Sequence, residues 1–180
     1  MRARSLAPLL ALACLLALVS PSLLLGPSPF PLPSGARAGD LAGEDLVGVV
    51  VRVVDGDTVW VRLAAGVEKV RYIGIDAPET SHPTRGEEPG GRAATLVNSR
   101  LVGDRTVRLE PDVQRRDRYG RLLAYVWVPA TDGGELMANA EMVRLGYAAV
   151  LTVPPNVRHA ALFRKLATEA REHRRGLWAP

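Results

Sequence analysis

The stretch LVGVVVRVVDGDTVWVRLAAGVEKVRYIGID, residues 46–76, decides the fold. Valines crowd residues 46–54, apolar and polar residues alternate over 58–63, and a third run rich in β-formers covers 70–75. Such runs predict strands, and the corners that contain Asp-Gly and Ala-Gly predict tight turns between them. Three consecutive strands form an antiparallel meander. Asp57 fits this pattern poorly, because it stands at the start of the second strand, where aspartate is disfavoured.

The remainder of the chain adds two strands and three helices. A loop rich in proline and glycine follows the meander, and apolar residues at helical and strand spacing return after it. The predicted elements are, in order, a helix at 92–102, strands at 106–109 and 122–128, and helices at 135–145 and 156–175. Asn156 is expected to cap the last helix and Gly176 to end it. The order β-β-β-α-β-β-α-α predicts an α+β fold dominated by a β-barrel, namely a five-stranded OB-fold with three helices.

Residues 1–38 differ in composition from the rest of the chain. Two arginines precede an apolar run at 6–25, a proline-rich linker follows, and an Ala-Arg-Ala sequence ends the segment. This arrangement predicts a secretory signal peptide, and the length of the apolar run leaves an uncleaved membrane anchor as the alternative. The domain itself is expected at 39–180, in a secreted or cell-envelope bacterial protein. It has no disulfide, because the chain's one cysteine, Cys14, lies in the leader.

The total charge is weak evidence for a polyanionic partner. The chain has 23 lysines and arginines against 19 acidic residues, a net charge of +4. Three of these arginines lie in residues 1–38, which carry no acid, so residues 39–180 have a net charge of +1. The local distribution of arginine is more informative. Arg115, Arg116 and Arg118 concentrate positive charge in the loop before the last strand, where they could attract phosphate.

Four acidic residues, Asp55, Asp57, Asp76 and Glu79, lie in the meander and in the loop after it. In a meander the first turn and the end of the third strand share one end, so Asp57 and Asp76 can come close. Two adjoining carboxylates repel each other unless a positive charge lies between them. The chain has few histidines and one cysteine, so a hard divalent cation with oxygen ligands, Ca²⁺ or Mg²⁺, is the natural candidate.

Two arginines complete a possible set of reactive groups. Arg71 lies on the third predicted strand and Arg121 opens the fifth. Taken singly, each charged residue is more simply explained as a solvated surface group. Taken together, they match the needs of phosphodiester hydrolysis. A metal polarises the phosphoryl oxygen, a free carboxylate such as Glu79 activates water, and arginines stabilise the charge that builds up in the transition state.

Three longer motifs occur in order: VVDGDTV (53–59), VRYIGIDAPET (70–80) and RDRYGRLLAYVW (116–127), with GLW at 176–178 after them. Over about residues 46–178 they resemble the staphylococcal nuclease (thermonuclease) family. The resemblance implies an OB-fold with three helices and a Ca²⁺-dependent endonuclease that hydrolyses DNA and RNA. We expect single-stranded nucleic acid as the preferred substrate and a monomeric protein.

The resemblance also implies a role for each matching position. Asp55 is similar to an acid beside the metal ligands, and Tyr119 to a tyrosine beside the bound nucleotide. Arg118 is expected to contribute to substrate binding through its charge. The remaining positions are Asp57, Asp76 and the backbone carbonyl of Ala77 as ligands of Ca²⁺, Glu79 as general base, and Arg71 and Arg121 as phosphate-binding catalytic arginines.

One departure limits the match to the family. The family has two tyrosines in its nucleotide pocket where this chain reads VLTVPPN (150–156), so a weaker hold on substrate is expected.

His82 lies close to Glu79 in the sequence. A solvated loop histidine is a simpler interpretation of it than a catalytic histidine. The alternative for the whole domain is an OB-fold that binds nucleic acid without cutting it. Retention of every catalytic position favours the enzyme.

Overall fold

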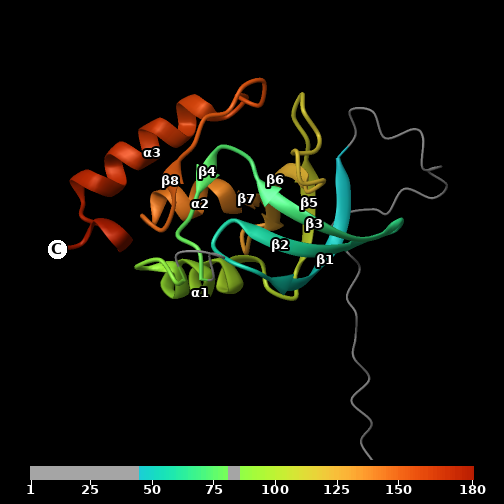
Figure 1. The fold of residues 1–180 in the computed structure, drawn as a ribbon, viewed down its shortest axis with the longest axis horizontal. Helices are drawn as coiled ribbons and strands as arrows, with labels where there is room; N and C mark the ends of the chain where they lie inside the picture. The colour runs from blue at the N-terminus through green and yellow to red at the C-terminus, as the bar shows by residue number, and fades with distance from the viewer. Residues whose placement is uncertain (1–44, 81–85) are drawn as a thin grey trace, which may run out of the picture.

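Two later strands join the three strands of the opening stretch in a closed barrel. The computed structural model describes residues 45–80 and 86–180 of the chain. In this part of the chain the barrel consists of β1 (Leu46–Val53), β2 (Thr58–Leu63), β3 (Gly66–Tyr72), β5 (Thr106–Glu110) and β6 (Leu122–Pro129), as Figure 1 shows.

The register of the barrel follows from the alternation of valines. Val50 pairs with Val61 and Val59 pairs with Val70, and all four side chains are buried. Successive side chains of a strand point to opposite faces, so this register gathers the valines inside the barrel. β1 and β6 flank β5 as antiparallel neighbours, and a short parallel pairing between β3 and β6, beginning at Val70 and Leu122, closes the barrel. The predicted five-stranded OB-fold is therefore confirmed.

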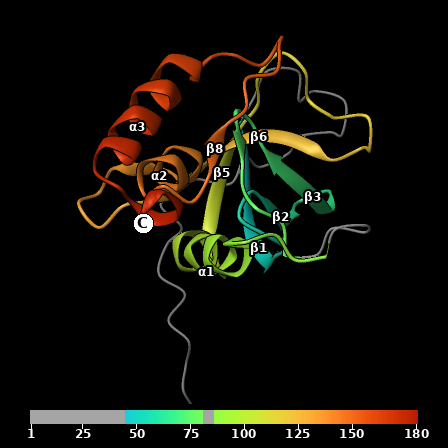
Figure 2. The same cartoon turned by 60° about the vertical axis from the view of Figure 1, so that its left-hand side comes forward.

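The helices cover one side and one end of the barrel. α1 (Gly91–Val102) and α2 (Ala138–Arg144) contact each other, and α2 lies between the barrel and α3 (Ala160–Glu172) in both views (Figures 1 and 2). A 3₁₀ helix, η1 (Gly176–Trp178), follows α3. Buried residues of α2 and α3, such as Met142 and Phe163, extend the barrel core toward this side.

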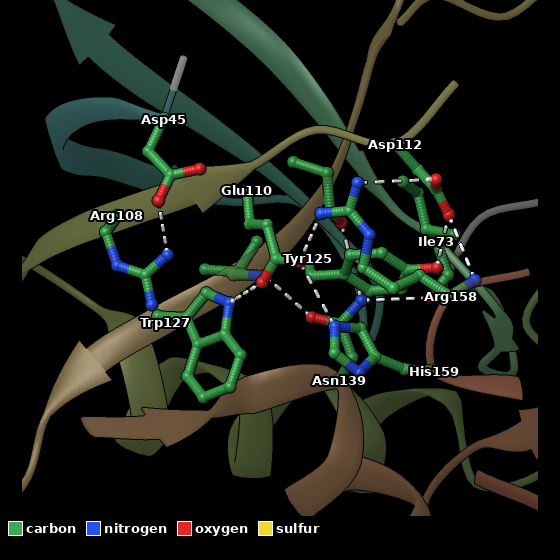
Figure 3. A network of polar contacts seen from close by, with 12 residues as sticks. Asp45, Ile73, Arg108, Glu110, Asp112, Tyr125, Trp127, Asn139, Arg158 and His159 are labelled. Atoms are coloured by element: carbon green, nitrogen blue, oxygen red, sulfur yellow. Dashed lines mark hydrogen bonds and ion pairs between the residues drawn. The ribbon is translucent and has the colours of Figure 1, made fainter. Parts of the chain in front are cut away.

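A polar network fastens the start of α3 to the barrel (Figure 3). Glu110, at the end of β5, accepts a hydrogen bond of 2.7 Å from Arg158, and its Oε1 lies 3.2 Å from Nε2 of His159. Asp112 accepts hydrogen bonds from the Tyr125 hydroxyl at 2.9 Å and from the Arg158 backbone at 3.1 Å. Burial acts to raise the pKa of both carboxyls, but these partners outweigh it and hold each pKa below its ordinary value.

The third predicted strand and the second predicted helix differ from the sequence-based boundaries. The predicted strand at 70–75 is two elements, because β3 ends at Tyr72 and a separate strand, β4 (Ile75–Asp76), pairs with β8 (Ala149–Val150). The predicted helix at 135–145 begins with a strand, β7 (Glu135–Met137), which pairs with the edge of β6. In both cases a partner strand far away in the sequence decides the local structure.

The last helix is shorter than predicted at both ends. α3 begins at Ala160, and the predicted cap, Asn156, is buried and bonded elsewhere. At the other end Arg174, with φ of 49°, takes the left-handed position expected for Gly176. The Arg175 N–H donates to the Ala170 carbonyl and the Arg174 N–H to the Arg171 carbonyl, which is the Schellman arrangement. The prediction of Gly176 as the terminating residue was therefore wrong by two positions.

The predicted signal peptide or anchor at 1–38 and His82 both lie outside the described residues. Among the helices at 45–80 and 86–180, none is long and apolar enough to cross a membrane.

Candidate active site

Asp57 is the buried centre of the candidate site. Only 4% of the residue is exposed. Its Oδ1 accepts a hydrogen bond from the Thr58 hydroxyl at 2.9 Å, and its Oδ2 accepts one from the Ala77 N–H at 2.8 Å. Asp55 shapes the preceding turn by accepting the Asp57 N–H at 3.1 Å. Aspartate is disfavoured at the start of a strand, but at the start of β2 Asp57 directs its carboxylate toward Ala77, the residue that follows β4.

Arg71 joins Asp57 to Asp76. The β2–β3 register places Arg71 opposite Thr58, next to Asp57. Its Nη2 lies 3.1 Å from Asp57 Oδ2 and 2.8 Å from Asp76 Oδ1, while its Nη1 donates to the carbonyls of Tyr72 at 2.9 Å and Ile75 at 2.8 Å. The two carboxylates predicted to approach each other therefore do so, and both contact one nitrogen of Arg71.

The electrostatics of this cluster favour additional positive charge. The pKa of Asp57 is raised to about 7, mainly because the carboxyl is buried; Arg71 acts to lower this pKa, and the nearby Asp55 acts to raise it. Desolvation penalises the charged form of a carboxyl, and a nearby cation restores it. A divalent ion beside Asp57 would therefore hold this carboxyl in its ionised form.

The donor set fits a hard cation that keeps some of its water. Asp57, Asp76 and the backbone carbonyl of Ala77 offer oxygen only, as Ca²⁺ and Mg²⁺ prefer. The Asp76 side chain is 61% exposed, so solvent or substrate could complete the coordination. Within 45–80 and 86–180, no group of three or more histidine, cysteine, aspartate or glutamate side chains is arranged to hold a metal ion. Two carboxylates and a carbonyl stay the predicted ligands of such a site.

Glu79 projects from a well-fixed backbone close to these ligands. The residue is exposed, its N–H donates to Oε2 of Glu88 at 3.1 Å, and its carbonyl accepts the Glu88 N–H at 2.9 Å. Gly91 approaches so closely that a Cβ there would lie 2.5 Å from the Glu79 carbonyl oxygen. This packing fixes where the Glu79 side chain begins. Its role as general base stays a prediction.

Arg121 and Arg71 line the same cavity. The cavity has a volume of about 340 Å³, and both arginines line it together with Arg118 and Tyr119. Asp117 holds Arg121, accepting its Nε at 2.6 Å and its backbone N–H at 3.0 Å. Burial acts to raise the pKa of Asp117, but the hydrogen bonds from Arg121 outweigh it and the pKa lies below its ordinary value.

Tyr119 stands at the mouth of this cavity. The residue is 68% exposed, and the guanidinium groups of Arg118 and Arg121 lie 4.8 and 5.5 Å from its ring centroid. Arg118 also donates to the Tyr119 hydroxyl at 2.6 Å. The predicted substrate-binding pair is therefore assembled next to Arg121. Where the family has tyrosines, the aliphatic side chains of Leu151 and Val153 line the cavity.

The arginine-dense loop is less available to phosphate than its composition indicates. Arg116 forms an ion pair with Glu68 at 2.8 Å and donates to the Gly120 carbonyl. Arg115 is partly buried, and its Nη2 is a buried nitrogen without a hydrogen-bond partner. Of the three arginines proposed to attract phosphate, Arg118 alone lines the cavity.

Sequence reasoning missed two residues that build the site. Asp117 positions Arg121, and Asn156 holds the loop that carries both. The Asn156 amide accepts the Gln114 N–H at 2.7 Å and donates to the Gln114 carbonyl at 2.8 Å. The D-x-x-x-R spacing of Asp117 and Arg121 was a usable signal, because an aspartate at the start of a turn can accept several N–H groups. No local pattern could identify the partner of Asn156.

Comparison with known proteins gives a consistent result. The profile of the family "Staphylococcal nuclease homologue" matches residues 69–180. A thermonuclease of Staphylococcus intermedius is 36% identical over 139 residues, which cover 77% of this chain and 79% of that protein. A thermonuclease of Staphylococcus hyicus is 35% identical over 72% of this chain and 74% of its own length. The SPbeta prophage-derived endonuclease YokF of Bacillus subtilis is 37% identical over 76% of this chain and 45% of its own.

Proposed function

This chain belongs to the staphylococcal nuclease family and is a nuclease that hydrolyses phosphodiester bonds, and we propose that it is a Ca²⁺-dependent endonuclease acting on DNA and RNA. One observation carries the proposal. A single guanidinium, that of Arg71, contacts both Asp57 and Asp76 and also lines the cavity that holds Arg121. Groups that suit a cation and groups that suit a phosphate therefore meet at one residue.

The proposed metal is Ca²⁺, which membership of the family favours and with which the oxygen donor set agrees. Asp57, Asp76 and the Ala77 carbonyl would hold it, and when bound it supplies a Lewis acid that polarises a phosphoryl oxygen. Thr58 and the Ala77 N–H keep the Asp57 carboxylate in one orientation, so the ligand is preorganised. Such supporting hydrogen bonds commonly decide how well a metal ligand performs.

The arginines would act on the phosphate itself. Arg71 on β3 and Arg121, which immediately precedes β6, line the same cavity, so they would clamp two non-bridging oxygens of one phosphodiester. Charge on these oxygens increases in the transition state, which makes fixed guanidinium groups more effective there than in the ground state. Glu79 would accept the proton of the attacking water, a role that suits an exposed carboxylate on a fixed backbone.

Several properties of the substrate follow from the same cavity. Its lining of Tyr119, Leu151 and Val153 offers an apolar surface for a base, which a single strand exposes more readily than a duplex. Contacts to phosphate and an apolar wall do not distinguish deoxyribose from ribose, which favours action on both DNA and RNA.

The leader at 1–38 supports export of the protein. Export would involve either a cleaved signal or retention in the envelope through residues 6–25. The enzyme is proposed to act as a monomer.

The test is hydrolysis of single-stranded DNA and RNA by the purified protein. We expect degradation with Ca²⁺ and none after addition of EDTA. Glu79→Gln, Arg71→Ala and Arg121→Ala should each lower kcat/KM by a factor on the order of 10² or more. Arg100→Ala removes an exposed arginine of α1 and serves as the matched control. Binding of nucleic acid without Ca²⁺-dependent hydrolysis would overturn the proposal and favour a non-catalytic binding module.

A further inference from the structure

A second cavity lies beside Asp76. It has a volume of about 200 Å³, and its walls include Pro78, Ala149, Leu177 and Trp178. Its size is below the roughly 300 Å³ at which pockets begin to enclose a whole drug-sized ligand. It therefore suits one flat ring system better than a complete nucleotide.

The two cavities follow one another along the β4–β8 ribbon. In this ribbon Ile75 pairs with Val150 and Asp76 pairs with Ala149. The first cavity is lined by Ile75 and Leu151, whereas the second is lined by Asp76 and Ala149. The boundary between them thus falls at Asp76, whose carboxylate contacts Arg71. A phosphodiester held at Arg71 would have one cavity on each side.

The chemistry of the second cavity suits a base and not a phosphate. The residues that line it include no lysine or arginine, so its described walls offer no cation to a second phosphate. Trp178 is 37% exposed, although burial of apolar surface would favour covering it. The guanidinium of Arg171 lies 4.7 Å from the centroid of this ring and adds a cation beside it.

The position of Trp178 is fixed by backbone contacts. The Leu177 N–H donates to the Gly146 carbonyl at 3.0 Å, and Nη1 of the Arg175 side chain donates to the Arg144 carbonyl at 3.1 Å. A Cβ on Gly146 would lie 2.2 Å from the Arg175 carbonyl oxygen and 3.1 Å from a carbon of the Trp178 ring. The C-terminal segment is therefore docked tightly onto the end of α2, and its exposed indole needs little ordering before it binds a ligand.

From these observations we propose that the second cavity binds the base of the neighbouring nucleotide, across the scissile phosphate from the base in the first cavity. Trp178 provides the contact surface, and Pro78 and Leu177 provide the apolar walls. The inference rests on the proposed function. It makes the chain an endonuclease that recognises a base on each side of the bond it cuts.

The experiment uses tetranucleotides with a single cleavable bond. Only the central linkage is a phosphodiester, and the outer linkages are methylphosphonates. One substrate has all its bases, one lacks the base immediately 5′ of the central bond, and one lacks the base immediately 3′ of it. The wild-type protein and the variants Trp178→Leu, Trp178→Phe and Arg175→Ala are compared by kcat/KM for each substrate. Trp178→Leu keeps an apolar side chain. Arg175→Ala is the control for loosening of the same segment, because Arg175 does not line the cavity and its guanidinium donates to the Arg144 carbonyl.

We expect Trp178→Leu to lower kcat/KM about tenfold on the complete substrate, mainly by raising KM. The defect should vanish on the substrate that lacks one particular neighbouring base and persist on the other, while Trp178→Phe should restore most of the rate. Arg175→Ala should change all three substrates by the same factor. An equal effect of Trp178→Leu on all three would show a purely structural role and overturn the inference.

The wild-type protein provides a second test that does not depend on a folded variant. Removal of either neighbouring base should lower its kcat/KM about tenfold. If removal of one of them has no effect, the second cavity binds no base. Failure of the wild-type protein to cleave any of the substrates, or longer single strands, would instead refute the proposed function.

Discussion

The substitution Asn139→Leu tests how the helical side is tied to the barrel. Asn139 is fully buried on α2. Its Oδ1 accepts the Val126 N–H of β6 at 2.8 Å, and its Nδ2 donates to the Ile73 carbonyl at 2.9 Å and to the Ala124 carbonyl at 3.4 Å (Figure 3). Leucine has a similar size and none of these donors or acceptors.

The structure sets the size of the effect. The Ala124 carbonyl also accepts the Ile73 N–H at 3.0 Å, so it keeps a partner after the substitution. The Val126 N–H and the Ile73 carbonyl lose the partner that Asn139 supplies. Each buried polar group left without a hydrogen bond costs about 1–3 kcal/mol, so we expect unfolding to become easier by about 3–4 kcal/mol. That is a large part of the roughly 5–15 kcal/mol that stabilises a typical domain.

Urea unfolding followed by tryptophan fluorescence measures this change. With a slope of about 2 kcal/mol per molar, the midpoint should fall by about 1.5–2 M. Thr168→Ala is the control, because Thr168 is an exposed residue of α3 whose hydroxyl bonds only within its own helix. It should shift the free energy of unfolding by less than about 0.5 kcal/mol. A loss of under 1 kcal/mol for Asn139→Leu would refute the reasoning, since it would mean that both orphaned groups find other partners.

Three further predictions concern single side chains. Arg174→Gly should stabilise the protein by about 0.5–1 kcal/mol in the same urea assay, because a non-glycine residue with φ of 49° is strained; destabilisation would show that the arginine side chain matters more than the backbone. Asp117→Asn should lower kcat/KM by about 10- to 100-fold because Arg121 loses its charged partner, whereas Asp132→Asn, in an exposed turn, should leave kinetics unchanged. Burial acts to raise the pKa of Asp112, but its hydrogen bonds outweigh burial, so the pKa in the folded state lies below the ordinary aspartate value. The contribution of Asp112 to stability is therefore complete above the ordinary aspartate pKa. It is lost as pH falls through the lower, folded value. Asp112→Asn should therefore lose less stability than the wild type between pH 5 and pH 2.5, and an identical acid slope would contradict this.

The parts of the fold that could be predicted are those encoded by local alternation. Val59 and Val61 mark β2 as half-buried without any knowledge of its neighbours, and the Asp-Gly corner identifies the turn before it. β7 could not be predicted in this way, because Glu135–Met137 is a strand only through its pairing with β6. The same applies to β4, which exists through its pairing with β8.

The candidate site shows a similar division. Asp57 stood out because it contradicts its local environment, and the meander geometry correctly brought it close to Asp76. Asn156 at the site and Asn139 in the core carried no such contradiction. Each has a hydrogen-bond partner far away along the chain, because Ile73 lies 66 residues from Asn139 and Gln114 lies 42 residues from Asn156. A hydrogen bond over such a separation depends on the finished topology, which no short window of sequence contains.

The short parallel pairing that closes the barrel has a consequence for how the enzyme responds to its substrate. Val70 to Tyr72 pair with Leu122 to Ala124, Arg71 lies within this seam, and Arg121 immediately precedes it. The cavity lined by the two arginines therefore depends on this pairing. A phosphodiester bound by both arginines would favour the closed barrel and would stabilise it by about 2.7 kcal/mol at a hundredfold excess over Kd. Occupancy of the site and resistance of the barrel to unfolding should then rise and fall together.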